Sequence, residues 1–294
     1  MQRFPLGQFS VARIGFGAMQ LPGPGVFGPP RDRGQALAVL RRAVELGVDH
    51  IDTAQFYGPD VANELIREAL HPYPDNLVLV SKVGGRRDEK GNWLPVDEPG
   101  ELRRDIEENL RSLGVDRLAA VNLRVMDTDA HEPNQPGTLR ADEFETQLET
   151  MIKARDEGQI EGIGLSNITL EHLSFALDRT DIVCVQNALN LADRFSQPVL
   201  DECTERGIAF VPFFPLGSAF VPDNPVLGNP IVRRTAEQLG RTPAQIALAW
   251  TLALAPNILL IPGTSSVRHL EENMAVADIE LDDGTVTELN AIAG

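Results

Sequence analysis

Short apolar runs alternate along the chain with longer segments in which apolar residues recur every three or four positions. Short runs rich in β-branched residues predict buried strands, and the longer spacing predicts amphipathic helices. The eight predicted strands are residues 13–17, 50–54, 77–82, 119–124, 161–166, 181–186, 208–213 and 258–262. The clearest predicted helices are residues 34–47, 62–70, 101–114, 144–158 and 242–255.

Eight strands that alternate with helices over 294 residues predict an α/β protein, a (β/α)8 TIM barrel that forms a single domain over residues 1–294. A doubly wound sheet is the alternative, and it would require a glycine-rich phosphate loop after the first strand. The sequence GFGAM at 15–19 is followed instead by a proline-rich loop that does not open a helix at once. The barrel is therefore favoured.

The composition indicates a globular protein with an acidic surface, because 43% of the residues are hydrophobic and the net charge is -17. Nucleic acids and anionic membranes bind cationic surfaces, so neither is expected as a partner. The chain has no apolar run of membrane-spanning length and no apolar signal region at its start, so we expect a cytoplasmic protein. Cys184 and Cys203 indicate neither a disulfide framework nor a metal site. The oligomeric state stays open.

Polar residues follow the predicted strands at their C-terminal ends, where barrel enzymes carry their active sites. In strand order these ends carry Asp52, Lys82, Arg124, Ser166 with Asn167, Gln186, Phe213 and Pro262 with Gly263. The strand interiors are apolar. Since scattered loop polarity would not concentrate in this way, a functional site is predicted there.

Three of these positions predict acid–base chemistry. Lys82 is one of three lysines, and Tyr57, which closely follows Asp52, is one of two tyrosines. A lysine beside a phenol favours the phenolate form, so the tyrosine can act as a general acid toward a carbonyl oxygen. Asp52 would hold Lys82 charged and in place. A structural ion pair explains any one of these residues alone, whereas all three at adjacent strand ends favour catalysis.

Longer motifs resemble the aldo-keto reductase superfamily and occur in the order typical of that family. They are GVDHIDTAQFYG (47–58), LVLVSKVG (77–84), LGVDRLAAVNLRVMD (113–127), IEGIGLSN (160–167), VCVQN (183–187), FFPLG (213–217) and IPGTSSVRHLEEN (261–273). The resemblance implies a carbonyl reductase with NADPH as cofactor and no metal. Residues 17–33 and 259–274 are similar to bacterial members that reduce pyridoxal, which implies pyridoxal or another small aromatic aldehyde as the substrate.

The family resemblance also implies roles for individual residues. The catalytic residues would be Asp52, Tyr57 and Lys82, with Arg124 in the place of the usual histidine. The implied cofactor-binding residues are Ser166, Asn167 and Gln186 at the nicotinamide carboxamide, Phe213 on its ring, Leu216, Gly217 and Ser218 near the pyrophosphate, and Gly263, Thr264, Ser265, Arg268, Glu272 and Asn273 around the adenosine and 2′-phosphate. The loops above the barrel are expected to bind substrate through Met19, Gln20, Phe56, Trp93 and Val125.

Arg124 admits three interpretations. It could donate hydrogen bonds to the carbonyl oxygen and stabilise a developing alkoxide, since an arginine stays protonated at working pH. It could anchor a polar group of the substrate, such as the phenolic oxygen of a pyridoxal ring, which is compatible with the first role. It could also pair with Asp127 and be structural.

Two other functions remain open for the whole protein. Lys82 at a barrel strand end could be the nucleophile of a Schiff-base aldolase, although the motifs at 160–187 and 261–273 have no purpose in such an enzyme. The substituted histidine position also leaves room for an NADP-binding regulatory protein with weak turnover or none.

Overall fold

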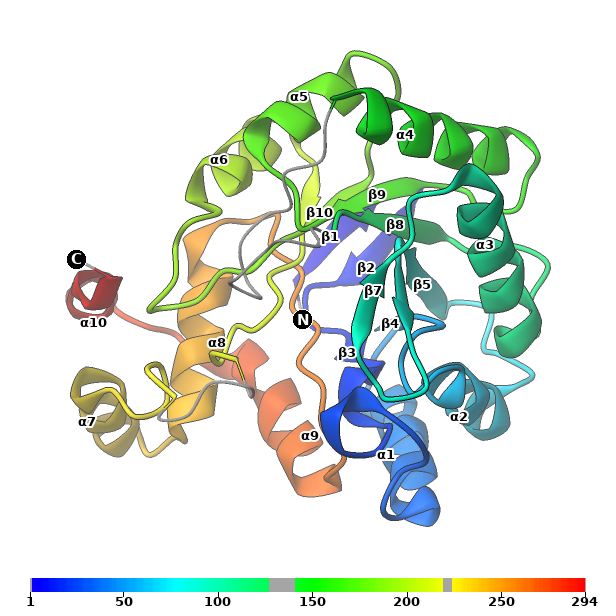
Figure 1. The fold of residues 1–294 in the computed structure, drawn as a ribbon. Helices are drawn as coiled ribbons and strands as arrows, with labels where there is room; N and C mark the ends of the chain where they lie inside the picture. The colour runs from blue at the N-terminus through cyan, green and yellow to red at the C-terminus, as the bar shows by residue number, and fades with distance from the viewer. Residues whose placement is uncertain (1, 127–140, 219–223, 294) are drawn as a thin grey trace.

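A parallel sheet of seven strands curves around a central axis, and helices cover its outer face (Figure 1). The computed structural model of the chain describes residues 2–126, 141–218 and 224–293. In sheet order the strands are β3 (Phe16–Gly17), β4 (His50–Asp52), β5 (Val78–Val83), β8 (Ala120–Arg124), β9 (Ile163–Ser166), β10 (Cys184–Gln186) and β11 (Ala209–Phe210). Each of these strands lies within, or one residue beyond, a predicted one.

The eighth predicted strand closes the sheet through single bridges instead of a regular ladder. Ile258 bridges to Phe210 at one edge, and Leu260 bridges to Ile14 at the other. The Leu260 carbonyl accepts a hydrogen bond of 2.8 Å from the amide of Gly15. The two edges are therefore joined, and the prediction of a (β/α)8 barrel is confirmed.

Ten α-helices surround the barrel within the described residues, and the five predicted ones are confirmed to within a few residues. Their bounds are α1 (Arg33–Glu45), α2 (Val61–Leu70), α3 (Pro99–Leu113), α4 (Ala141–Asp156), α5 (Leu170–Leu177), α6 (Gln197–Arg206), α7 (Pro230–Leu239), α8 (Pro243–Leu254), α9 (Val267–Met274) and α10 (Asp283–Asn290). The helices that the sequence pattern did not predict, α5, α6, α7, α9 and α10, have eight to ten residues, close to the length of the predicted α2. None of the helices described is both long enough and apolar enough to cross a membrane.

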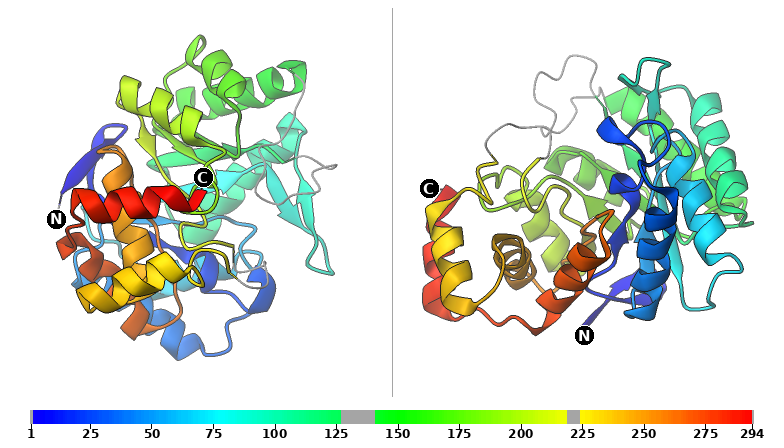
Figure 2. Two further views of the ribbon diagram at one scale, coloured as in Figure 1. Left: turned by 90° about the vertical axis from the view of Figure 1, so that its left-hand side faces the viewer. Right: turned by 90° about the horizontal axis from the view of Figure 1, so that it is seen from below.

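Two antiparallel hairpins extend the barrel, and neither was predicted. The first, β1 (Arg3–Leu6) and β2 (Phe9–Ala12), packs Leu6 and Val11 against interior residues near the starts of the barrel strands. It therefore covers the N-terminal end of the barrel, as the right-hand view of Figure 2 shows. The second, β6 (Gly85–Arg87) and β7 (Trp93–Pro95), follows β5 at the opposite, C-terminal end.

Side chains along each strand alternate between the barrel interior and the layer beneath the helices. In β5, Val80 belongs to the interior cluster, whereas Leu79 and Val83 pack in the large core under the helices. Lys82 stands two residues after Val80 and so faces the interior. This alternation decides which of the polar residues at the strand ends meet.

Asp60, at the N-terminus of α2, is a partly buried carboxylic acid that lacks full hydrogen bonding. Its backbone is left-handed, with φ of 61°, and its Oδ1 atom has no hydrogen-bond partner in the described part of the chain. Burial, followed by repulsion from Glu108, raises the pKa of Asp60 from 3.8 to about 7. The folded protein therefore favours the protonated acid.

We predict that Asp60→Asn stabilises the protein at pH 8 and has little effect at pH 4. The contribution of a raised carboxyl pKa is complete below the unfolded value near 3.8 and is lost as the pH rises through about 7. Asparagine keeps a neutral side chain and tolerates a left-handed backbone. Urea unfolding should show a gain of on the order of 1 kcal/mol at pH 8, after allowance for solvent screening. An equal gain at both pH values would contradict this explanation.

Candidate active site

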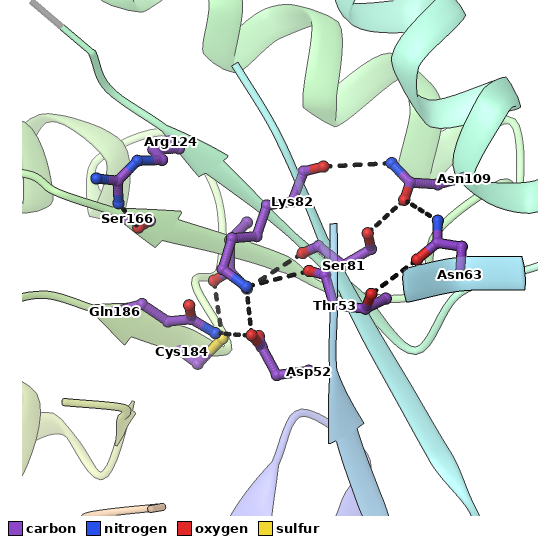
Figure 3. A network of polar contacts seen from close by, with 11 residues as sticks. Asp52, Thr53, Asn63, Ser81, Lys82, Asn109, Arg124, Ser166, Cys184 and Gln186 are labelled. Carbon is purple, nitrogen blue, oxygen red and sulfur yellow. Dashed lines mark hydrogen bonds and ion pairs between the residues drawn. The ribbon is translucent and has the colours of Figure 1, made fainter. Parts of the chain in front are cut away.

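A buried ion pair occupies the C-terminal end of the barrel interior. Lys82 Nζ contacts Asp52 Oδ1 and also donates a 3.1 Å hydrogen bond to the Thr53 carbonyl. From across the barrel, Gln186 Nε2 donates to Asp52 Oδ2 at 2.6 Å (Figure 3). Both carboxylate oxygens of Asp52 therefore have donors, and β4, β5 and β10 are tied together at this point.

Lys82 is held in its charged form. Burial alone would lower the pKa of Lys82, but the negative charge of Asp52 and the hydroxyl of Tyr57 outweigh burial, and the pKa is raised. An ammonium group is a poor nucleophile, because a Schiff-base lysine needs its free amine form. The structure therefore argues against the aldolase hypothesis.

Tyr57 lies beside this lysine, in the loop between β4 and α2. Its side chain is 6% exposed, and Lys82 Nζ lies 5.1 Å from the centre of its ring. The Tyr57 carbonyl accepts a 3.1 Å hydrogen bond from the amide of Ala62 in α2, which fixes the loop. Asp52, Tyr57 and Lys82 are thus brought together, as the sequence predicted.

Arg124 ends β8 and is only partly buried. Its Nη1 atom donates a 3.2 Å hydrogen bond to Ser166 Oγ, and its guanidinium lies 5.2 Å from the ring centre of Phe213. Burial lowers the pKa of Arg124, whereas Tyr57 acts in the opposite direction. No carboxylate of a described residue forms an ion pair with it, and Asp127 lies outside the described residues. Among the described residues, the carboxylate of Asp52 therefore pairs with Lys82 and not with Arg124.

Ser166, Asn167 and Gln186 lie together at the ends of β9 and β10. Ser166 and Gln186 are register partners, and the amide of Asn167 donates to the Gln186 carbonyl at 2.9 Å. All three side chains are buried, yet Gln186 Oε1 has no hydrogen-bond partner within the described residues. An acceptor left open in this place suits a ligand with an amide donor.

The loop after β11 approaches the same end of the barrel. Phe213 is partly buried, and its amide donates to the Asn187 carbonyl at 3.0 Å. Gly217 has a left-handed backbone, with φ of 81°, and its amide donates to the Phe214 carbonyl at 2.9 Å. Leu216 is partly buried and Ser218 is buried. These four predicted residues belong to one segment, in which Phe213 bridges to Ala188 and residues 214–217 form a turn.

The segment from Gly263 to Asn273 follows the closing strand and leads into α9. A side chain on Gly263 would lie 2.5 Å from the Gly17 carbonyl, so the two chain segments approach closely here. Arg268 has a side chain that is 76% exposed and pairs with Glu272 at 3.4 Å. Thr264 and Asn273 are buried, whereas Ser265 is exposed. Within the segment, Arg268 and His269 are the residues available to meet an anionic group.

The predicted substrate-binding residues divide into two groups. Phe56 contacts Tyr57 edge-on at 5.3 Å and Trp93 at 5.6 Å between ring centres, so the three rings form a row. Trp93 is 37% exposed, and the guanidinium carbon of Arg87 lies 4.0 Å from the centre of the Trp93 ring. The remaining predicted residues differ in exposure: Met19 is partly buried, Gln20 is exposed and Val125 is fully buried. Val125 therefore packs inside the structure.

Sequence reasoning missed two buried asparagines next to Lys82. Asn122, an interior residue of β8, donates to the Ser81 carbonyl at 3.3 Å and accepts from Cys184. Asn109 of α3 donates to the Lys82 carbonyl at 3.2 Å. A polar residue within the apolar run LAAVNLR was a usable signal for Asn122. Asn109 lies between Ile106 and Leu113 on the buried face of α3, so a polar residue on that stripe was a comparable signal. No group of three metal-binding side chains occurs in the described part of the chain.

Comparisons with known proteins identify the family of this chain. Residues 13–293 match the model of the aldo/keto reductase family. The chain is 50% identical to pyridoxine 4-dehydrogenase of Escherichia coli, covering 99% of this chain and 98% of that protein. It is 37% identical to an uncharacterized oxidoreductase of Schizosaccharomyces pombe, covering 97% and 88% of the two chains.

A solved structure shares the fold over nearly the whole chain. It is an aldo/keto reductase from Klebsiella pneumoniae in complex with NADP and acetate, which is 26% identical, with a TM-score of 0.78 and coverage of 98% and 94%. The match to the family model covers 281 residues of this chain, from 13 to 293. The chain therefore belongs to the aldo/keto reductase family of oxidoreductases.

Proposed function

We propose that this protein is an NADPH-dependent carbonyl reductase that converts pyridoxal to pyridoxine. The observation that carries the proposal is the buried Asp52–Lys82 pair beside Tyr57, with a cationic Arg124 at the same barrel end. The 50% identity to a pyridoxine 4-dehydrogenase supports the substrate. The Klebsiella reductase in complex with NADP supports the cofactor.

The residues of this chain fit a nicotinamide cofactor. Gln186 Oε1 is a buried acceptor without a partner among the described residues, and Ser166 and Asn167 lie beside it, which suits a carboxamide. Phe213 would cover the nicotinamide ring, Leu216, Gly217 and Ser218 would lie along the pyrophosphate, and Gly263, Thr264, Ser265, Arg268, Glu272 and Asn273 would hold the adenosine part. When bound, NADPH supplies the hydride for the carbonyl carbon.

Tyr57 is the general acid in this proposal. Its hydroxyl donates a proton to the carbonyl oxygen, and the ammonium of Lys82 stabilises the phenolate that remains. Asp52 keeps Lys82 charged and fixes its position, so the charge near the phenol does not depend on solvent. Phe56 and Trp93 supply an aromatic wall for an aromatic aldehyde.

Arg124 stabilises the negative charge that develops on the substrate oxygen. It stays protonated at working pH, so it supplies hydrogen bonds and positive charge but no proton. Ser166 and Phe213 hold the guanidinium, and no described carboxylate neutralises it. The same donors suit the phenolic oxygen of a pyridoxal ring, so both roles are compatible with one position.

The proposal is tested by following NADPH oxidation with pyridoxal, pyridoxal phosphate and benzaldehyde, and by repeating the series with NADH. We expect the highest kcat/KM for pyridoxal with NADPH. Tight NADPH binding without turnover of any aldehyde would instead indicate a regulatory binding protein. Equal use of NADH and NADPH would contradict a role for Arg268 at a 2′-phosphate.

Tyr57→Phe should lower kcat for aldehyde reduction by about 100-fold or more, because the proton donor is lost. NADPH affinity, measured by fluorescence titration, should stay within about twofold. Tyr73→Phe is the matched control. Tyr73 lies in the loop after α2, and its hydroxyl donates a 2.6 Å hydrogen bond to the carbonyl of Leu113 at the end of α3. If Tyr57→Phe kept wild-type turnover, the assignment of the acid would be wrong.

Arg124→Ala should lower kcat/KM by at least about tenfold, since loss of one oxyanion donor commonly costs this much or more. Cofactor affinity should remain nearly unchanged. Arg124→His, which restores the usual family residue, should retain more activity than Arg124→Ala. Steady-state kinetics of the three proteins with pyridoxal provide the measurement, and identical kinetics for all three would leave only the structural interpretation.

A further inference from the structure

A cluster of buried polar side chains lies behind Lys82, between strands β4 and β5 and helices α2 and α3. This polar cluster consists of Thr53, Gln55, Asn63, Ser81, Asn109 and Ser112. Figure 3 shows Thr53, Asn63, Ser81 and Asn109 on the side of Lys82 that faces away from Gln186. The cluster interrupts a layer between sheet and helices that is otherwise filled by side chains such as Leu65, Ile66 and Ile106.

Asn109 is the centre of the polar cluster. Its Nδ2 atom donates to Gln55 Oε1 at 2.9 Å and to the Lys82 carbonyl at 3.2 Å. Its Oδ1 atom accepts from Asn63 Nδ2 at 3.0 Å and from the hydroxyl of Ser81. The Asn109 side chain is 0% exposed. One amide therefore joins two helices and two strand ends.

The contacts of the polar cluster lead to all three residues that we propose for proton transfer. Asn109 holds the backbone of Lys82 directly, and Gln55 precedes Tyr57 by two residues in the same loop. Asn63 accepts a 2.7 Å hydrogen bond from Thr53 Oγ1. Thr53 follows Asp52, and its carbonyl accepts the hydrogen bond from Lys82 Nζ at 3.1 Å.

Burial of this many polar groups is costly unless each finds a partner. Leucine-sized apolar side chains would fill the same layer without that requirement, as they do elsewhere in it. No buried side-chain polar atom of the cluster lacks a partner, because its members bond to one another and to the backbone carbonyls of Lys82, Gly85, Asp105 and Glu108. Such a network fixes relative positions more strictly than apolar packing, because hydrogen bonds are directional.

We propose that Asn109 is a positioning residue that sets the location of Lys82 relative to Tyr57. The inference rests on the proposed function, in which Lys82 stabilises the phenolate of Tyr57. Asn109 touches neither the substrate nor the cofactor in this proposal, and it acts through the Lys82 backbone and the loop of Tyr57. Loss of its contacts should therefore change proton transfer more than ligand binding.

The two tyrosines allow a measurement that is independent of turnover. Tyrosinate absorbance near 295 nm reports ionisation of Tyr57 and Tyr73, and burial raises the pKa of Tyr73 to about 12. Tyr57→Phe identifies the step that belongs to Tyr57. In Asn109→Leu, which is similar in size and introduces no charge, the Tyr57 step should move to higher pH, since a displaced Lys82 stabilises the phenolate less.

Kinetics supply the second measurement. Asn109→Leu should lower kcat for pyridoxal reduction by about tenfold or more, with KM and NADPH affinity within about threefold of wild type. The alkaline limb of the pH profile of kcat should shift in the same direction as the Tyr57 step. Gln55→Met, which removes only one arm of the cluster, should show smaller changes of the same sign and serves if Asn109→Leu does not fold.

Asn257→Leu is the matched control. Asn257 is equally buried, donates to the Ile208 carbonyl at 2.9 Å and accepts from Thr204 at 2.9 Å, but it lies at the start of the closing strand, away from Lys82. The Asn257→Leu variant should be less thermally stable than the wild-type protein, with no change in the Tyr57 step. The proposal is overturned if the Tyr57 step of Asn109→Leu and of Gln55→Met occurs at the same pH as in the wild-type protein. It is also overturned if Asn257→Leu shifts the Tyr57 step as far as Asn109→Leu does. If Asn109→Leu shifts the Tyr57 step but the wild-type protein reduces no aldehyde, the proposed function alone is refuted.

Discussion

The ion pair between Asp52 and Lys82 is the interaction on which the arrangement of the barrel's C-terminal end depends. Two opposite charges in a protein interior cost several kcal/mol each in lost hydration unless their partners are well placed. Here Gln186 donates a hydrogen bond to the second carboxylate oxygen of Asp52, and the Thr53 carbonyl accepts a hydrogen bond from Lys82. The hydrogen bond from Gln186 crosses the barrel interior and joins β10 to β4, which are not neighbours in the sheet.

Closure of the sheet is the constraint that brings these strands together. The last strand segment is held by single bridges on both sides, to Phe210 and to Ile14, instead of by a long ladder. Close backbone contact replaces side-chain packing at this seam, since Gly17 and Gly263 leave no room for a Cβ atom. The seam therefore places the predicted adenosine-binding segment next to the loop that follows β3.

Two cationic side chains lie at the described barrel end of an acidic protein. The chain carries a net charge of -17, and Lys82, which pairs with Asp52, and Arg124 both lie at this end. The guanidinium of Arg124 pairs with no carboxylate of a described residue, which suits anionic ligands and developing oxyanions. The net charge of the chain thus disfavours partners such as nucleic acids, whereas the charges at the barrel end determine which ligands and reacting groups the site suits.

The sequence alone determined the fold class and much of the candidate site. Strand spacing predicted eight strands, and the strand ends predicted a site that includes Asp52, Lys82, Arg124, Ser166 and Gln186. The structure brings these side chains together because residues of one parity share the barrel interior. The hairpins escaped prediction, since their strands of three or four residues are too short for a pattern to repeat, and five of the ten described helices were not predicted either. Helix ends marked by glycine or by threonine and proline were predicted to within a few residues.

Only the tertiary structure decided which polar groups have partners. It placed Val125 in the packed interior, left Gln186 Oε1 open and gave Arg124 contacts with Ser166 and Phe213. It also revealed that Asn109, more than 25 residues after Lys82 in the chain, holds the backbone of that lysine. Periodicity reports which face of an element is buried, but hydrogen bonds between distant elements depend on the packing of the complete chain.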